Sequence, residues 1–285
     1  MLPLNIRLTM YIEYFSALAL SMTLSTITTF AFELVGESDK MSGIELWADF
    51  SREFPMALLA GIFSFLILIF FYYASLRGIS LPIKILITVV ATPILSTATI
   101  IFAEAILLAV YKELNIMLLN LLILASIYAS TLLSILLLSG VLATRIRSFI
   151  FLIYGSFLGS VSGMALPLAV VVTTCLITSF FDAYAINVLF RKEMRDLGSR
   201  VSHSKDYVSK LIEVGLGDFI FISIIPAMTY YRFGLFLSLF SSALIFIGWM
   251  VNLVLILRRD LIAGLPIPVV LGLLPSIVLL ISYAA

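Results

Sequence analysis

Long apolar runs, separated by short clusters of charged or turn residues, follow one another along the whole chain. A helix that crosses the hydrocarbon core of a bilayer needs roughly 20 apolar residues. The pattern predicts an all-α, polytopic membrane protein that forms a single transmembrane domain over residues 1–285. Nine transmembrane helices are expected near 10–34, 55–76, 82–110, 117–142, 147–164, 166–190, 211–230, 233–257 and 262–283. Eight or ten spans also fit, because 82–110 is long enough to break and only a weak turn at 163–167 separates two of the runs.

Basic residues are distributed unequally between the two ends of these spans. With the N-terminus inside, 13 of the 17 Lys and Arg residues fall in inner segments and 4 fall in outer ones. Lys and Arg accumulate in short loops on the cytoplasmic side. We therefore expect a cytoplasmic N-terminus, an external C-terminus and a solvated cytoplasmic loop at 191–210. The short loops suggest a prokaryotic plasma membrane.

The composition narrows the range of chemistry that the chain supports. Hydrophobic residues make up 62% of the chain and charged residues 12%, and the mean hydropathy is +1.21, which excludes an ordinary water-soluble enzyme. Cys175 and His203 are the single cysteine and histidine, so neither a disulfide within the chain nor a Cys/His metal site is expected, and no cofactor is indicated. A net charge of +1 gives no basic field for nucleic acid.

Acidic residues inside apolar runs are the main candidates for function. A charge at the middle of a span costs about 2.5–3.5 kcal/mol on insertion scales, and such residues usually face the protein interior or a water-filled cavity. Glu13, Glu33 and Glu213 lie near span ends, where the carboxylate reaches the interface, and they favour a structural interpretation. Glu104 lies deeper and has no evident basic partner, and it is interpreted as a helix-packing or interface residue, with a functional role as the alternative.

Asp182 and Asp218 are set apart by their matching positions. Asp182 lies nine residues before Arg191, and Asp218 lies eight residues after Lys210, at the two ends of the same inner loop. At a rise of ~1.5 Å per residue, both carboxylates lie about 12–13 Å below one membrane face, on adjacent antiparallel helices. Two carboxylates that approach closely cannot both ionise, so they would share one proton. That arrangement is the catalytic dyad of an aspartic protease.

Two glycines precede Asp218, in the sequence Val214-Gly215-Leu216-Gly217-Asp218. Without Cβ atoms, they allow a backbone to approach closely, from either a neighbouring helix or an extended substrate. A stripe at four-residue spacing, Gly155, Gly159 and Gly163, has no acid nearby and is expected to serve helix packing.

Three segments resemble the motifs of the presenilin and signal-peptide-peptidase family of intramembrane aspartyl (GxGD-type) proteases, most of all those of its archaeal presenilin homologues. Residues 215–221 (GLGDFIF) are similar to the family's G-x-G-D motif, and residues 181–185 (FDAYA) resemble its Tyr-Asp motif. Residues 263–267 (AGLPI) resemble its Pro-Ala-Leu-Pro signature. Two of the segments depart from the family: Phe181 replaces the usual tyrosine, so the role of that hydroxyl is lost or passes to another group such as Tyr184, and Ala263-Gly264 replaces Pro-Ala.

The resemblance implies a presenilin-like fold and an intramembrane aspartic endopeptidase. Asp182 and Asp218 would be catalytic, and the substrate would be a transmembrane protein or peptide that enters laterally from the lipid bilayer and unwinds. The resemblance also implies that the unwound strand is lined by Gly215, Leu216, Gly217, Leu265 and Pro266. Animal presenilins act within a larger complex, but the short loops here offer no obvious docking domain, so the protein is expected to act alone or as a homo-oligomer, without a metal.

A polytopic transporter or ion-leak pathway is the alternative function, with the two aspartates holding a cation or relaying protons. Transporters often contain paired inverted halves, and residues 1–140 show no such symmetry with residues 141–285. The sequence therefore favours the protease.

Overall fold

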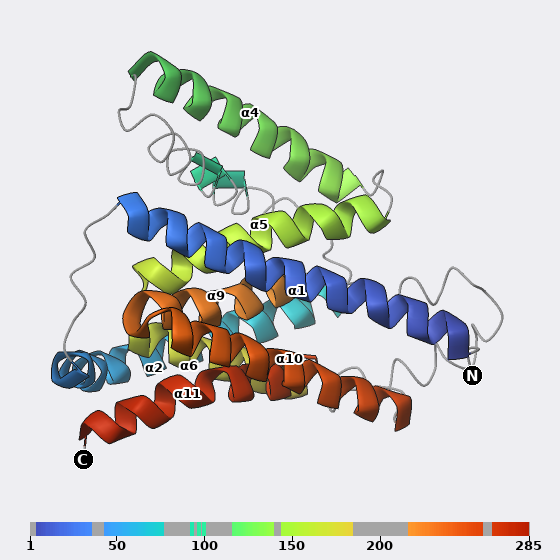
Figure 1. Cartoon of the computed structure of the whole chain (residues 1–285). Coiled ribbons are helices and arrows are strands. Elements are labelled where there is room, and N and C mark those ends of the chain that lie inside the picture. The colour runs from blue at the N-terminus through green and yellow to red at the C-terminus, as the bar shows by residue number, and fades with distance from the viewer. Residues whose placement is uncertain are drawn as a thin grey trace.

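The computed structural model describes residues 4–35, 43–76, 116–139, 144–184, 216–258 and 264–284, together with a few residues between 92 and 100. These residues form helices and contain no strand (Figure 1). The helices are α1 (Leu4–Val35), α2 (Gly43–Leu76), α4 (Ile116–Ser139), α5 (Thr144–Ala165), α6 (Leu168–Tyr184), α9 (Leu216–Phe233), α10 (Leu235–Arg258) and α11 (Pro266–Ala284). Most of the expected span 82–110 and all of the expected loop 191–210 lie outside the described residues.

Several helices are as long and as apolar as helices that span a membrane. Within the described residues, three segments are long and apolar enough to cross a bilayer: Ser148–Ala165, Leu235–Asn252 and Pro266–Ala284. Shorter apolar segments are Phe15–Phe30, Asn120–Leu133 and Leu168–Tyr184. Large apolar side chains point outward, such as Phe236, which is 84% exposed, and Met117, which is 78% exposed. Such exposed apolar surface suits lipid and not water, so the chain is a membrane protein.

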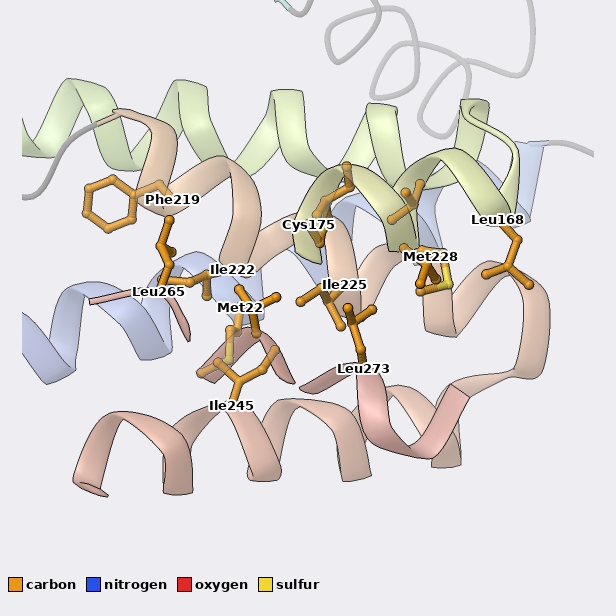
Figure 2. Packing of buried hydrophobic residues seen from close by; sticks show 14 of the residues in the cluster. Met22, Leu168, Cys175, Phe219, Ile222, Ile225, Met228, Ile245, Leu265 and Leu273 are labelled. Atoms are coloured by element: carbon orange, nitrogen blue, oxygen red, sulfur yellow. The ribbon is translucent and has the colours of Figure 1, made fainter. Parts of the chain in front are cut away.

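Helix α9 lies at the centre of the bundle (Figure 1). It contacts α1, α5, α6, α10 and α11, and every residue from Ile222 to Tyr230 is buried. Ile225 and Met228 of α9 belong to one apolar core that also takes side chains from α6, α10 and α11 (Figure 2). Because α9 begins near Asp218, the same packing that fixes α9 also fixes the position of this aspartate.

Glycines and serines hold α9 against α5 and α1. A Cβ at Gly159 would lie 2.5 Å from the carbonyl oxygen of Ile220, and one at Gly163 would lie 2.5 Å from that of Ile224. The backbones of α5 and α9 therefore approach as closely as glycine allows, which confirms the predicted packing role at these two positions. Ser21 of α1 joins the contact, with its Oγ 2.7 Å from Ser156 Oγ and 2.8 Å from Ser223 Oγ.

Short turns connect the helices around the core. The α5–α6 turn lies at Leu166 and Pro167, inside the weak turn expected at 163–167. Gly234 separates α9 from α10 with a φ of 94°, a left-handed conformation that glycine adopts without strain. Its N–H donates to the Tyr230 carbonyl at 2.8 Å. This tight turn brings α10 back along α9, and α11 then packs against both.

Candidate functional site

Asp182 lies in the last described turn of α6, and its side chain is half-buried. Its Oδ2 accepts a hydrogen bond from the backbone N–H of Leu265 at 2.9 Å. The carboxylate also interacts with the backbone of Gly264. This contact joins the FDAYA segment to the AGLPI segment, which lie 83 residues apart in the sequence.

The geometry of α11 explains why the Leu265 N–H is available. The Leu265 carbonyl accepts the first hydrogen bond of the helix, from the Val269 N–H at 3.0 Å, so Leu265 occupies the capping position. Pro266 follows as the first helical residue, where its missing N–H costs nothing and its fixed φ suits the helix. The N–H groups at a helix start have no partner within the helix, and Asp182 supplies one for Leu265.

Asp218 lies in the first turn of α9, also half-buried. The next residue, Phe219, is 1% exposed and belongs to the same core cluster as the Leu265 side chain. Figure 2 shows these two side chains together at one end of the core. Helices α6 and α9 contact each other, and α11 contacts both. The three segments that carry the resemblance therefore meet at one end of the bundle, and the adjacency expected for α6 and α9 is confirmed.

The positions expected to line a substrate strand differ in their surroundings. Gly217 is exposed, and no atom of the described residues lies within 4 Å of the place where its Cβ would be. The Leu265 side chain is buried in the core, and its N–H is already bonded to Asp182. Pro266 is half-buried. Gly215 lies outside the described residues, as does the side chain of Leu216, so their expected role stays a prediction.

Among the remaining candidates from the sequence, Phe181 and Tyr184 flank Asp182 on α6, Glu33 lies on α1, and the others are outside the described residues. The Phe181 ring packs edge-to-face on Phe65 of α2, with centroids 5.4 Å apart, and Tyr184 is 37% exposed. Glu33 interacts with the Tyr230 hydroxyl, in agreement with a structural role. Glu104, Glu213 and His203, and the side chain of Glu13, are not among the described residues.

Two residues that the sequence did not single out hold the Gly264–Leu265 segment from the α10 side. Asn252 Nδ2 donates to the Gly264 carbonyl at 2.6 Å, and the Trp249 ring would lie 3.3 Å from a Cβ at Gly264. Neither residue carries a motif, and only their position against α11 reveals the contact. In the part of the chain that the structure describes, no three His, Cys, Asp or Glu residues gather into a metal site.

Comparisons with protein families and with curated proteins identified no relative of this chain. No protein-family model matches the chain, and no curated protein matches it significantly.

Proposed function

We propose that this membrane protein is an intramembrane aspartic endopeptidase of the presenilin and signal-peptide-peptidase type, with Asp182 and Asp218 as its dyad. One observation carries the proposal: the hydrogen bond from Leu265 N–H to Asp182 Oδ2. It ties the first aspartate to the proline-containing segment. Phe219, the neighbour of the second aspartate, packs in the same cluster as Leu265. A function that used either aspartate alone would not require these three segments to converge.

The chemistry follows from two carboxyl groups that share one proton. The ionised carboxylate removes a proton from a water molecule, and the water oxygen attacks the carbonyl carbon of the scissile peptide. The protonated carboxyl donates a hydrogen bond to the carbonyl oxygen and stabilises the negative charge that develops there. The tetrahedral intermediate then collapses: the C–N bond breaks, and the leaving nitrogen takes a proton from the dyad. No metal or cofactor enters this scheme.

The surroundings of Gly217 support access by a peptide backbone. A substrate helix must unwind before its peptide bond reaches the dyad, and an extended strand needs room beside backbone groups to which it can bond. Beside Gly217, next to Asp218, no other described part of the chain fills the place of a Cβ. In this conformation the Leu265 N–H is bonded to Asp182, so a strand would pair with neighbouring backbone groups or displace that bond. We propose Gly215, Leu216, Gly217, Leu265 and Pro266 as the lining of this strand.

The substrates proposed are transmembrane proteins or peptides, taken from the bilayer by a protease acting alone or as a homo-oligomer. The distribution of basic residues favours a presenilin-like orientation in a prokaryotic plasma membrane, with water reaching the dyad from the cytoplasmic side.

Cleavage of a single-span substrate by detergent-purified protein tests the proposal. Wild-type protein should give two peptide products. Asp182→Asn and Asp218→Asn should each give none, because each removes one half of a shared-proton pair while keeping the side-chain volume. An aspartyl-protease transition-state analogue should also suppress cleavage.

The same variants in liposomes separate the protease from the alternative, a transporter or ion-leak pathway. If folded wild-type protein cleaves none of several substrates but carries cations or protons across the bilayer, and either aspartate variant changes that flux, the protease proposal is wrong. Cleavage without flux supports it.

A further inference from the structure

Asn252 is a fully buried polar residue outside all three motif segments. It lies on α10, is 0% exposed, and its Nδ2 donates to the Gly264 carbonyl oxygen at 2.6 Å. That carbonyl and the Leu265 N–H belong to the same peptide group. The Leu265 N–H in turn donates to Asp182 at 2.9 Å. One planar peptide unit is therefore bonded on its oxygen side by Asn252 and on its hydrogen side by Asp182.

This two-sided bonding affects both the orientation and the strength of the contact to Asp182. A peptide unit is rigid, so a bond that fixes its oxygen also fixes the direction of its N–H. Hydrogen bonds in a chain polarise one another, and a donor on the carbonyl oxygen makes the N–H of the same peptide a stronger donor. Asn252 thus acts on Asp182 through the peptide group that joins Gly264 to Leu265.

Packing alone does not account for an asparagine at this position. The α10 face that meets α11 also contains Ser241, whose Oγ donates to the Gly272 carbonyl at 2.9 Å, and Gly248, where a Cβ would lie 2.6 Å from Pro268 Cα. These contacts hold the two helices together away from Leu265. The Oδ1 of Asn252 is buried and has no hydrogen-bond partner among the described residues. A leucine has the same branched shape and would not bury that oxygen, so the bond to Gly264 is what the amide group contributes at this position.

We propose that Asn252 is a positioning residue: its side-chain amide orients the Gly264–Leu265 peptide so that the Leu265 N–H holds the Asp182 carboxylate for catalysis. The catalytic part of this inference rests on the proposed protease function. The peptide clamp itself does not depend on that function and can be measured separately.

The experiment compares Asn252→Leu and Asn252→Ala with Ser241→Ala in detergent. Asn252→Leu keeps the branched shape of the side chain and removes the amide. Asn252→Ala guards against a packing clash in the leucine variant. Ser241→Ala is the matched control, because Ser241 is also 0% exposed and its Oγ bonds the Gly272 carbonyl of α11, eight residues beyond Gly264. Two readouts are taken for each protein: kcat and KM for cleavage, and the hydrogen-exchange rate of the Leu265 amide by NMR of ¹⁵N-leucine-labelled protein.

Both Asn252 variants should lower kcat about tenfold with little change in KM and should speed Leu265 amide exchange about tenfold, whereas Ser241→Ala should change neither. Unchanged kcat and unchanged exchange in folded Asn252 variants would overturn the inference, as would an equal loss of kcat in Ser241→Ala. If the wild type cleaves nothing, the protease proposal fails, while the exchange rates still decide whether Asn252 clamps the peptide.

Discussion

The glycines of α5 and the glycine beside Asp218 have opposite surroundings. At Gly159 and Gly163, a Cβ would come within 2.5 Å of α9 backbone oxygens, so glycine at these positions allows α5 and α9 to pack closely. At Gly217, the same added atom would meet nothing of the described chain within 4 Å. The first pair is explained by packing. Within the described residues no packing contact explains Gly217, which directly precedes a half-buried carboxylate in the first turn of α9.

The two regions also use their polar groups differently. Along the contact of α1, α5 and α9, hydroxyls bond to one another and to carbonyls one turn back, as Ser160 does with the Ser156 carbonyl at 2.6 Å. Such bonds satisfy small neutral groups inside a membrane protein. At the other region, the Asp182 carboxylate accepts a hydrogen bond from the backbone N–H of Leu265, at the start of α11. The first region holds the bundle together, and the second fixes an ionisable group against the start of α11.

Gly163→Ala should produce the largest loss of stability in the packed region. The added Cβ would lie 2.5 Å from the Ile224 oxygen and 2.9 Å from the Met228 nitrogen, and backbone atoms move only if the helices separate. Overpacking of this kind costs about 1–3 kcal/mol. Unfolding in a denaturing detergent should therefore begin at a lower denaturant fraction than for wild type. An unfolding midpoint equal to that of the wild type would show that the backbones of α5 and α9 lie further apart than these distances.

Gly217→Ala should give the reverse pattern, with stability kept and cleavage reduced. The Cβ meets no described atom, and alanine favours a helix over glycine by up to about 1 kcal/mol, so the unfolding midpoint should hold or rise. A methyl group in the space proposed for the substrate strand should lower kcat/KM about tenfold, or about 1.4 kcal/mol of transition-state stabilisation. Wild-type cleavage by a folded Gly217→Ala protein would remove Gly217 from the substrate path.

Ser21→Ala should have the smallest effect. It removes the hydroxyl that lies between Ser156 and Ser223, while Ser156 Oγ keeps its bond to the Leu152 carbonyl at 2.6 Å. Hydrogen bonds between membrane helices contribute about 0.6 kcal/mol on average. The unfolding midpoint should shift slightly, and kcat/KM should stay at the wild-type value. A large loss of cleavage would mean that the α1–α5–α9 contact takes part in catalysis after all.

The sequence predicted much of the helical arrangement because apolar length is a direct physical requirement of a membrane span. The described helices α1, α2, α4, α5, α6, α9, α10 and α11 each overlap one of the expected runs. Small-residue spacing similarly predicted that Gly159 and Gly163 pack against a helix. It did not identify α9 as the partner, because spacing along one helix carries no information about which neighbour it faces.

The candidate site was predictable only where its side chains are unusual. Asp182 and Asp218 stand out because carboxylates are rare in apolar runs. Asn252 does not stand out, since a single amide in a span is compatible with many packing roles. The contact of Leu265 with Asp182 uses a backbone N–H, a group that every residue except proline carries, so the leucine itself gave no signal for it.

Cross-linking of the two aspartate positions tests most directly whether they belong to one site. Asp182→Cys and Asp218→Cys would be combined in a Cys175→Ala background, with a protease site inserted in residues 191–210 and each single-cysteine protein as a control. Membranes would be treated with a short, reducible bifunctional thiol reagent and then with the protease. The two fragments should stay joined until the link is reduced, because α6 and α9 contact each other and Asp182 lies near the end of α6 while Asp218 lies near the start of α9. Fragments that separate although both cysteines have reacted with the reagent would contradict the dyad.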